Sequence, residues 1–152
     1  MTETKLPSSR PSVEANVFHL VREPIDIRKI ADSLQKPEDG AVVVFEGVVR
    51  NNSNDKAVRF LEYDAYESMA LKKLEEIGSR AKKEFAIRDI AIVHRLGHMD
   101  IGECSAVIVV TSAHRGPAFE ACRFAIDKIK EIVPIWKKEF YEDGEVWIEG
   151  AH

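Results

Sequence analysis

Two cations lie where a strand-like run meets a helix-like run. His114 and Arg115 stand between the apolar stretch that ends at Thr111-Ser112 and a helical stretch that opens at Gly116-Pro117. A proline suits the first turn of a helix, because the N–H that it lacks would have no partner there. Free backbone N–H groups and the positive end of the helix dipole favour an anion. The pattern indicates a phosphate cradle, although a helix start with two solvated side chains is equally compatible with it.

Two lysines follow on and after this helix. The predicted core stripe is Phe119, Cys122, Ile126, Ile129 and Val133. Lys130 follows Ile126 by one helical turn, so it lies at the border of the stripe, where its stem can pack while its ammonium faces a cleft. The chain turns back after Pro134, which predicts that Lys137 returns near Lys130. Neighbouring ammonium groups lower the pKa of one of them, which suits a nucleophile or proton carrier. Solvated surface lysines are the alternative.

Arg50 ends an apolar run in which Gly47 indicates a bulge or a close backbone approach. The arginine is positioned to meet a ligand at a sheet edge, or it is a plain strand-end charge. We interpret Cys104 and Cys122 as small buried hydrophobic residues rather than as sulfur chemistry. No metal site is expected, since the pair His94 and His98 has no third ligand nearby.

The bulk properties exclude several classes of protein. The chain has 152 residues and a formal net charge of −4, so no global basic field would attract a nucleic acid. Its apolar runs are too short to span a membrane, and the first residues lack the apolar core of a secretory signal. We expect a flexible tail over residues 1–15, a single domain over 16–152 and a cytoplasmic location.

The first half of the chain predicts strands around one short helix. A strand is expected near 17–21 and a helix over 25–34. Five consecutive apolar residues from Ala41 to Phe45 favour a strand buried on both faces. After the polar, mobile-looking loop 51–56, the stretch 57–65 resumes strand character. The two strands are expected to pair as an antiparallel hairpin with a long tip.

The second half predicts two long helices, over 67–85 and 117–133. Between them lie strands at 87–94 and 105–111, joined by a turn or short excursion that contains two glycines. Pro134 ends the second helix, and a closing hairpin follows around Asp143-Gly144. Hairpins combined with only two long helices favour an α+β sandwich of mostly antiparallel strands.

Five stretches of the sequence together resemble the large subunit of molybdopterin synthase, the MoaE family. They are GAVVVFEGVVRNNS, LEYDAYESMA, IVHRLGHMDIGE, VTSAHRGPAFEACRFAIDKIKEIVPIWKKE and EVWIEG. The resemblance covers about residues 40–149, and the first 39 residues carry no clear signature of the family. It implies an α/β-hammerhead-like fold with an added small subdomain.

The resemblance also implies a reaction and its partners. Members of the family form homodimers, and each protomer binds a small ubiquitin-like sulfur carrier, giving a heterotetramer. The carrier brings a C-terminal Gly-Gly thiocarboxylate, whose sulfur passes in two rounds to cyclic pyranopterin monophosphate to form the dithiolene of molybdopterin. No metal or organic cofactor is implied for this step.

The roles of single residues come from the same resemblance. Lys130 matches the principal catalytic lysine, with Lys137 assisting it. The substrate-binding positions are Val48, Val49, Arg50, His114, Arg115, Lys138 and Glu139. Lys130 would then act as a general acid or base and stabilise developing charge, while the arginines and the histidine hold the substrate anion.

Two other classes of function are compatible with parts of this pattern. A non-catalytic binding module would dock a ubiquitin-like tail and keep its affinity without Lys130. A phosphate-ester enzyme would turn over without a protein partner, but the sequence has neither a carboxylate cluster nor a P-loop to support it.

Overall fold

The structure is a computed structural model that describes residues 17–142 and 144–149, so the tail expected over 1–15 lies outside the described residues. No helix in these two ranges is long and apolar enough to cross a membrane. The elements in chain order are β1 (Phe18–Val21), α2 (Ile27–Leu34), β2 (Ala41–Val48), β3 (Asn52–Ser53), β4 (Lys56–Ala65), α3 (Glu67–Glu84), β5 (Asp89–Arg95), β6 (Gly97–Asp100), β7 (Cys104–Ser112), α4 (Arg115–Ile132), β8 (Ile135–Tyr141) and β9 (Gly144–Glu149).

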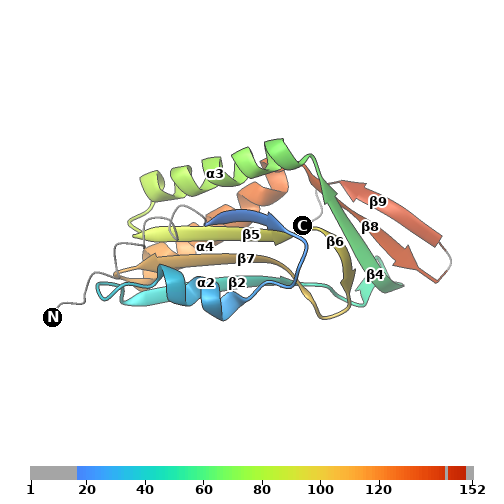
Figure 1. Cartoon of the computed structure of the whole chain (residues 1–152), viewed down its shortest axis with the longest axis horizontal. Helices are drawn as coiled ribbons and strands as arrows, with labels where there is room; N and C mark the ends of the chain where they lie inside the picture. The colour runs from blue at the N-terminus through green and yellow to red at the C-terminus, as the bar shows by residue number, and fades with distance from the viewer. Residues whose placement is uncertain (1–16, 143, 150–152) are drawn as a thin grey trace.

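The main sheet has the order β1-β5-β7-β2 and is antiparallel except for the β1–β5 pair. Helices α3 and α4 pack against each other and on one face of this sheet, and α2 packs on the other face (Figure 1). Because side chains alternate along a strand, the central strands β5 and β7 are apolar on both faces. Ile90, Ile92, Ile108 and Val110 join the core under α3 and α4, whereas Ala91, Val107 and Val109 join the core under α2. The predicted α+β sandwich with two long helices is confirmed.

Strand β2 does not match its prediction. It lies at the edge of the sheet, and its side chains alternate between partly buried and exposed. Val44 and Val48 are 42% and 48% exposed, although both are valines in an apolar run. The apolar run therefore marks an edge strand with an exposed apolar face, and the expectation of burial on both faces is wrong.

The hairpin expected between 41–50 and 57–65 is also wrong. Strand β2 pairs with β7, which lies far away in sequence, while β4 belongs to a second sheet with β3, β6, β8 and β9, called the small sheet. In that sheet β4 pairs with β6 and β8, and β8 pairs with β9, as the closing hairpin predicted. Figure 1 shows the small sheet projecting from one end of the main sheet.

The loop 51–56 is a tight turn rather than a long tip. Strands β3 and β4 pair with Ser53 opposite Lys56, which leaves only Asn54 and Asp55 at the turn. Both turn residues have positive φ, 51° and 66°. Two consecutive left-handed residues are typical of the type I′ hairpin, whose twist matches that of its strands.

Helix α4 begins two residues before its predicted start, so Arg115 rather than Pro117 is its first residue. The helix lies close to the sheet because its buried face is mostly small, with Ala118, Ala121, Cys122, Ala125 and Ile129. Phe119, which was expected in the core, is 60% exposed beside that face. A large ring has no room between a helix and a sheet that pack through alanines.

A buried ion pair closes the end of the main sheet that lies away from the small sheet. The Arg88 guanidinium binds both carboxylate oxygens of Asp39, at 2.6 and 2.7 Å, and also the hydroxyl of Thr111. Burial raises the pKa of Asp39, but the hydrogen bonds and the charge of Arg88 outweigh it and hold the pKa below its ordinary value. This pair fastens the α2–β2 turn to the start of β5.

Candidate active site

The predicted site residues fall into two groups, one toward each end of α4. Arg115 begins α4 and Lys130 lies in its last turn. A rise of 1.5 Å per residue separates these two positions by about 22 Å along the helix axis. Within a single chain, His114 and Arg115 therefore do not lie beside Lys130.

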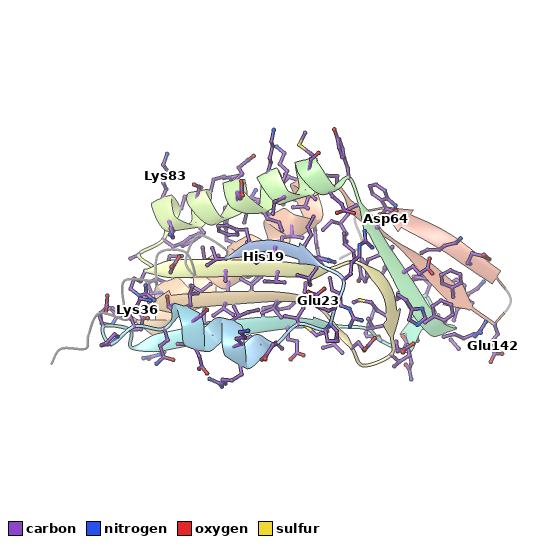
Figure 2. All side chains as sticks on the ribbon, in the orientation of Figure 1. His19, Glu23, Lys36, Asp64, Lys83 and Glu142 are labelled. Atoms are coloured by element: carbon purple, nitrogen blue, oxygen red, sulfur yellow. The ribbon has the colours of Figure 1, made fainter. Side chains whose placement is uncertain are left out.

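The strands under α4 also separate the two groups of site residues. The start of β2 lies beside the end of β7, where Gly40 donates its N–H to the carbonyl of Ser112 at 3.0 Å. The other end of β2 pairs Val48 with Cys104, and Arg50 follows there. In Figure 2, Lys36 lies beside the α2–β2 turn at one end of the main sheet, and Asp64 lies on β4 past the opposite end of that sheet. Arg50 therefore shares its end of the sheet with the last turn of α4.

His114 is the N-cap of α4, and Arg115 is its first residue; both are exposed. Among the described residues, neither forms an ion pair, and the His114 side chain makes no capping hydrogen bond. The backbone N–H of His114 donates to the Ser112 hydroxyl at 3.3 Å. A solvated imidazole and a solvated guanidinium at the positive end of an 18-residue helix are suited to bind an anion.

The Val48–Arg50 segment leaves the sheet at the irregularity predicted for Gly47. The β2–β7 register shifts between Gly47 and Val48, as a bulge requires. Beyond it, Val49 is 4% exposed and its backbone groups bond to Glu103 and Gly102. Val48 and Arg50 are exposed, so they are the members of this segment that can meet a ligand.

Lys137 forms an ion pair with Glu139. Its ammonium lies 3.2 Å from a carboxylate oxygen of Glu139, and its side chain is 21% exposed. Lys130, seven positions earlier in the sequence, is exposed and forms no ion pair within the described part of the chain. The expected lowering of the pKa of one of the two lysines stays a prediction. The contact that the structure provides for Lys137 is its ion pair with Glu139.

Lys138 belongs to the opposite face of β8, since successive side chains of a strand alternate. Its ammonium lies 3.8 Å from Glu145 and 5.3 Å from the centre of the Phe140 ring. The two lysines of the predicted segment therefore point to different surfaces of the small sheet.

Glu139 is only 2% exposed. Burial alone would raise the pKa of this carboxyl, but hydrogen bonds from Tyr141, Ser53 and Lys137 outweigh it and hold the pKa below its ordinary value. The Tyr141 hydroxyl donates to one carboxylate oxygen, and Lys137 contacts the other. Direct substrate binding by Glu139 stays a prediction, and its burial favours an indirect role.

Tyr63 and Ser105 connect this carboxylate to the Val48–Arg50 segment. Tyr63 is the register partner of Lys137, and its hydroxyl is hydrogen bonded to Ser105. Ser105 in turn donates to the carbonyl of Gly47 at 3.3 Å. Burial and the nearby charge of Glu139 raise the pKa of Tyr63. Hydrogen bonds thus join Tyr63 to the bulge in β2 through Ser105, and the charge of Glu139 acts on the Tyr63 hydroxyl from nearby.

Sequence reasoning did not identify Tyr63, Ser105, Ser53 or Tyr141 as parts of this region. One signal was present in β8, where Lys137, Glu139 and Tyr141 share the face of the buried Ile135. Polar groups at alternate positions on a buried face must find partners, and that requirement indicates a network.

The two cysteines are unsuited to nucleophilic chemistry. Burial raises the pKa of the Cys122 thiol to about 11. Burial and the charge of Glu46 raise the pKa of Cys104 to about 11. Thiols with such pKa values are protonated at neutral pH, and the thiolate is the nucleophile. Among the described residues, no three His, Cys, Asp or Glu side chains gather as a metal site would require.

Comparison with known proteins gives consistent results. The family model described as MoaE protein matches residues 20–132. The molybdopterin synthase catalytic subunit of Bacillus subtilis is 47% identical over 131 residues, which are 86% of this chain and 83% of that protein. A crystal structure of molybdopterin synthase from Staphylococcus aureus superposes with a TM-score of 0.84 at 42% identity, over 87% of this chain and 96% of that one. A complex of subunits 1 and 2 of molybdopterin-converting factor from Helicobacter pylori gives a TM-score of 0.71 at 26% identity, over 86% and 89%.

The burial of His94 should make the stability of the fold depend on pH. Its side chain is fully buried, with Nδ1 2.9 Å from the Arg95 carbonyl oxygen and its ring edge against Tyr63. Burial lowers its pKa from 6.5 to about 4. Between pH 6.5 and about 4, the histidine of the unfolded chain binds a proton and that of the folded chain does not. The free energy of unfolding should therefore fall by about 3 kcal/mol as the pH drops through this range.

Urea unfolding at a series of pH values, with wild type and His94→Gln, measures this effect. The variant should lose most of the pH dependence, whatever its stability at neutral pH. His98→Asn, which removes a half-exposed histidine, is the matched control and should keep the dependence. An unchanged slope in His94→Gln would refute the assignment.

Proposed function

The chain belongs to the MoaE protein family, and we propose that it is the large, catalytic subunit of a molybdopterin synthase. In this role it transfers sulfur from the thiocarboxylated C-terminus of a small carrier protein to cyclic pyranopterin monophosphate. Two free, unpaired cysteines are consistent with a reducing cytoplasm as the site of the reaction.

One observation carries the chemical part of the proposal. Lys137 is held by a buried carboxylate at the end of the molecule where α4 presents Lys130 and β2 leads to Arg50. Cations gathered at this end of α4 would suit a substrate that carries a phosphate and builds up negative charge during attack. Lys130 is exposed and forms no ion pair among the described residues, so its ammonium is accessible to a substrate.

The state of the cysteines supports an external source of sulfur. Attack requires a nucleophilic sulfur, and both thiols of this chain have raised pKa values and at least partial burial. A carrier that brings a thiocarboxylate supplies that nucleophile without a cysteine in the active site. The Helicobacter pylori relative, which forms a complex of two different subunits, supports a small protein as the partner.

A second copy of the chain is the second partner that we propose. His114 and Arg115 are suited to bind an anion but lie about 22 Å from Lys130 along α4. In a two-fold dimer with α4 antiparallel to its copy, the start of one helix lies beside the end of the other. Each of the two sites would then combine Lys130 and Lys137 of one protomer with His114 and Arg115 of its partner.

The edge of β2 is the surface that fits this arrangement. Its outer edge is unpaired among the described residues, and Val44 at its middle is 42% exposed. Between β2 and α4 lies an open groove of about 320 Å³, lined in part by Val44, Phe119 and Arg123. An exposed apolar edge strand favours pairing with another strand. Antiparallel pairing of β2 with its copy would bring the Ala41 end of one strand to the Val48 end of the other.

Replacement of Lys130 by alanine tests the catalytic proposal. With thiocarboxylated carrier and cyclic pyranopterin monophosphate, wild type should form molybdopterin, and Lys130→Ala should lose at least about 100-fold in rate, as for loss of a general acid or base. The carrier affinity of Lys130→Ala should stay within about twofold of wild type, since an exposed lysine contributes little to the fold.

Lys83→Ala is the matched control, because Lys83 is also an exposed lysine in the last turn of an 18-residue helix. It points away from α4 in Figure 2, and its activity should equal that of wild type. A wild-type protein that binds the carrier without forming product would instead support the binding-module alternative. Full activity of Lys130→Ala would remove this lysine from the mechanism.

Replacement of Val44 by aspartate tests the dimer surface. A charge at the middle of a β2–β2 contact would meet its own copy across the two-fold axis, so sedimentation should show a monomer with unchanged secondary structure. Met69→Asp introduces the same charge at a similarly exposed apolar residue on α3 and should stay dimeric. A dimeric Val44→Asp protein would exclude β2 as the contact.

A further inference from the structure

The buried face of β8 contains a carboxylate that the proposed reaction does not use directly. Glu139 is the register partner of Leu61, a core residue that is 4% exposed. An ionised carboxylate in such a place is stable only when hydrogen bonds and a counter-ion replace the water that it has lost. The groups that compensate Glu139 therefore determine where its oxygens lie.

Each oxygen of this carboxylate has its own partner. The Tyr141 hydroxyl donates to Oε1, and the Lys137 ammonium lies 3.2 Å from Oε2. The Ser53 side chain provides a third hydrogen bond from the β3–β4 turn. With Oε1 held by tyrosine, rotation of the carboxylate is restricted, and Oε2 stays directed at Lys137.

The ring of Tyr141 is buried and is contacted by a cation. Its ring is 9% exposed, and the Lys56 ammonium lies 5.2 Å from the ring centre. Ser53 and Lys56 flank the Asn54-Asp55 turn as register partners. The tight hairpin thus contributes one contact to the carboxylate and one to the tyrosine that orients it.

We propose that Tyr141 is a positioning residue of the active site, which acts through Glu139 to fix the ammonium of Lys137. Lysine has a flexible four-carbon stem, so a site that depends on the location of its ammonium needs a fixed partner. The inference rests on the proposed function insofar as Lys137 assists the sulfur transfer. It also changes the expected role of Glu139, which reaches the substrate through Lys137 rather than by contact.

The test replaces Tyr141 by phenylalanine, which removes one hydroxyl and keeps the ring in the core. In the molybdopterin-forming assay, kcat should fall by about tenfold, the effect of losing one hydrogen bond to a charged group, while KM for the pterin changes by less than about twofold. The loss of activity toward acid should move to higher pH, because Glu139 without this donor is protonated more readily. Tyr66→Phe makes the same chemical change at a tyrosine that is 59% exposed, and it should behave as wild type.

A second measurement does not depend on turnover. Carboxyl ¹³C NMR of the folded chain follows the titration of Glu139, whose midpoint should rise in Tyr141→Phe, because one hydrogen bond to the ionised form is lost. Ser53→Ala should move it in the same direction by a smaller amount. This variant lies on the hairpin rather than in the core, so it serves if Tyr141→Phe does not fold.

The outcomes separate this inference from the proposed function. If wild type forms molybdopterin and Tyr141→Phe matches it in kcat, pH profile and titration midpoint, the positioning role is wrong and the function stands. If wild type forms no product with a bound carrier, the proposed function fails. An unchanged titration midpoint of Glu139 in both Tyr141→Phe and Ser53→Ala would then overturn the inference as well. A raised midpoint would support the proposal that these hydroxyls hold the carboxylate of Glu139.

Discussion

The length of α4 is the constraint on which the arrangement of the site depends. A straight helix of 18 residues keeps its first and last turns apart, and the sequence puts cations in both. The alanines of its buried face hold the helix flat against β7 and β2, so bending does not bring the ends together. The chain thus carries two half-sites, an anion-binding start and a lysine-bearing end, and the proposed dimer is the simplest way to combine them.

The small sheet gives the lysine-bearing end its chemical character. It carries a buried carboxylate with three hydrogen-bonding partners, one of which is Lys137. Nearby, Tyr63 on β4 is hydrogen bonded to Ser105 on β7, which donates to Gly47 at the bulge in β2, from which the chain continues to Arg50. The main sheet and the small sheet are therefore linked by polar contacts at the place where the candidate catalytic residues lie. Substitutions there should affect chemistry and fold together.

The sequence alone predicted most helices and strands, because their periodicity is a local property. It did not predict that β2 is an edge strand, since burial on one or both faces depends on which distant strand pairs with it. For the same reason the sequence suggested a local hairpin where β2 pairs with β7. Phe119 fell on the apolar stripe of α4, but the space left by neighbouring alanines decided its exposure.

The candidate site was also predictable only in part. Residue types and the family resemblance predicted the cations, whereas the distance between the two groups follows only from the antiparallel packing of α4 on β7.

The most direct test of the shared site mixes Arg115→Ala chains with Lys130→Ala chains, after unfolding and refolding them together. A site shared between protomers predicts recovery of about one quarter of wild-type molybdopterin formation, because half of the dimers are mixed and each holds one intact site. Recovery no greater than the sum of the separate variants would contradict the shared site.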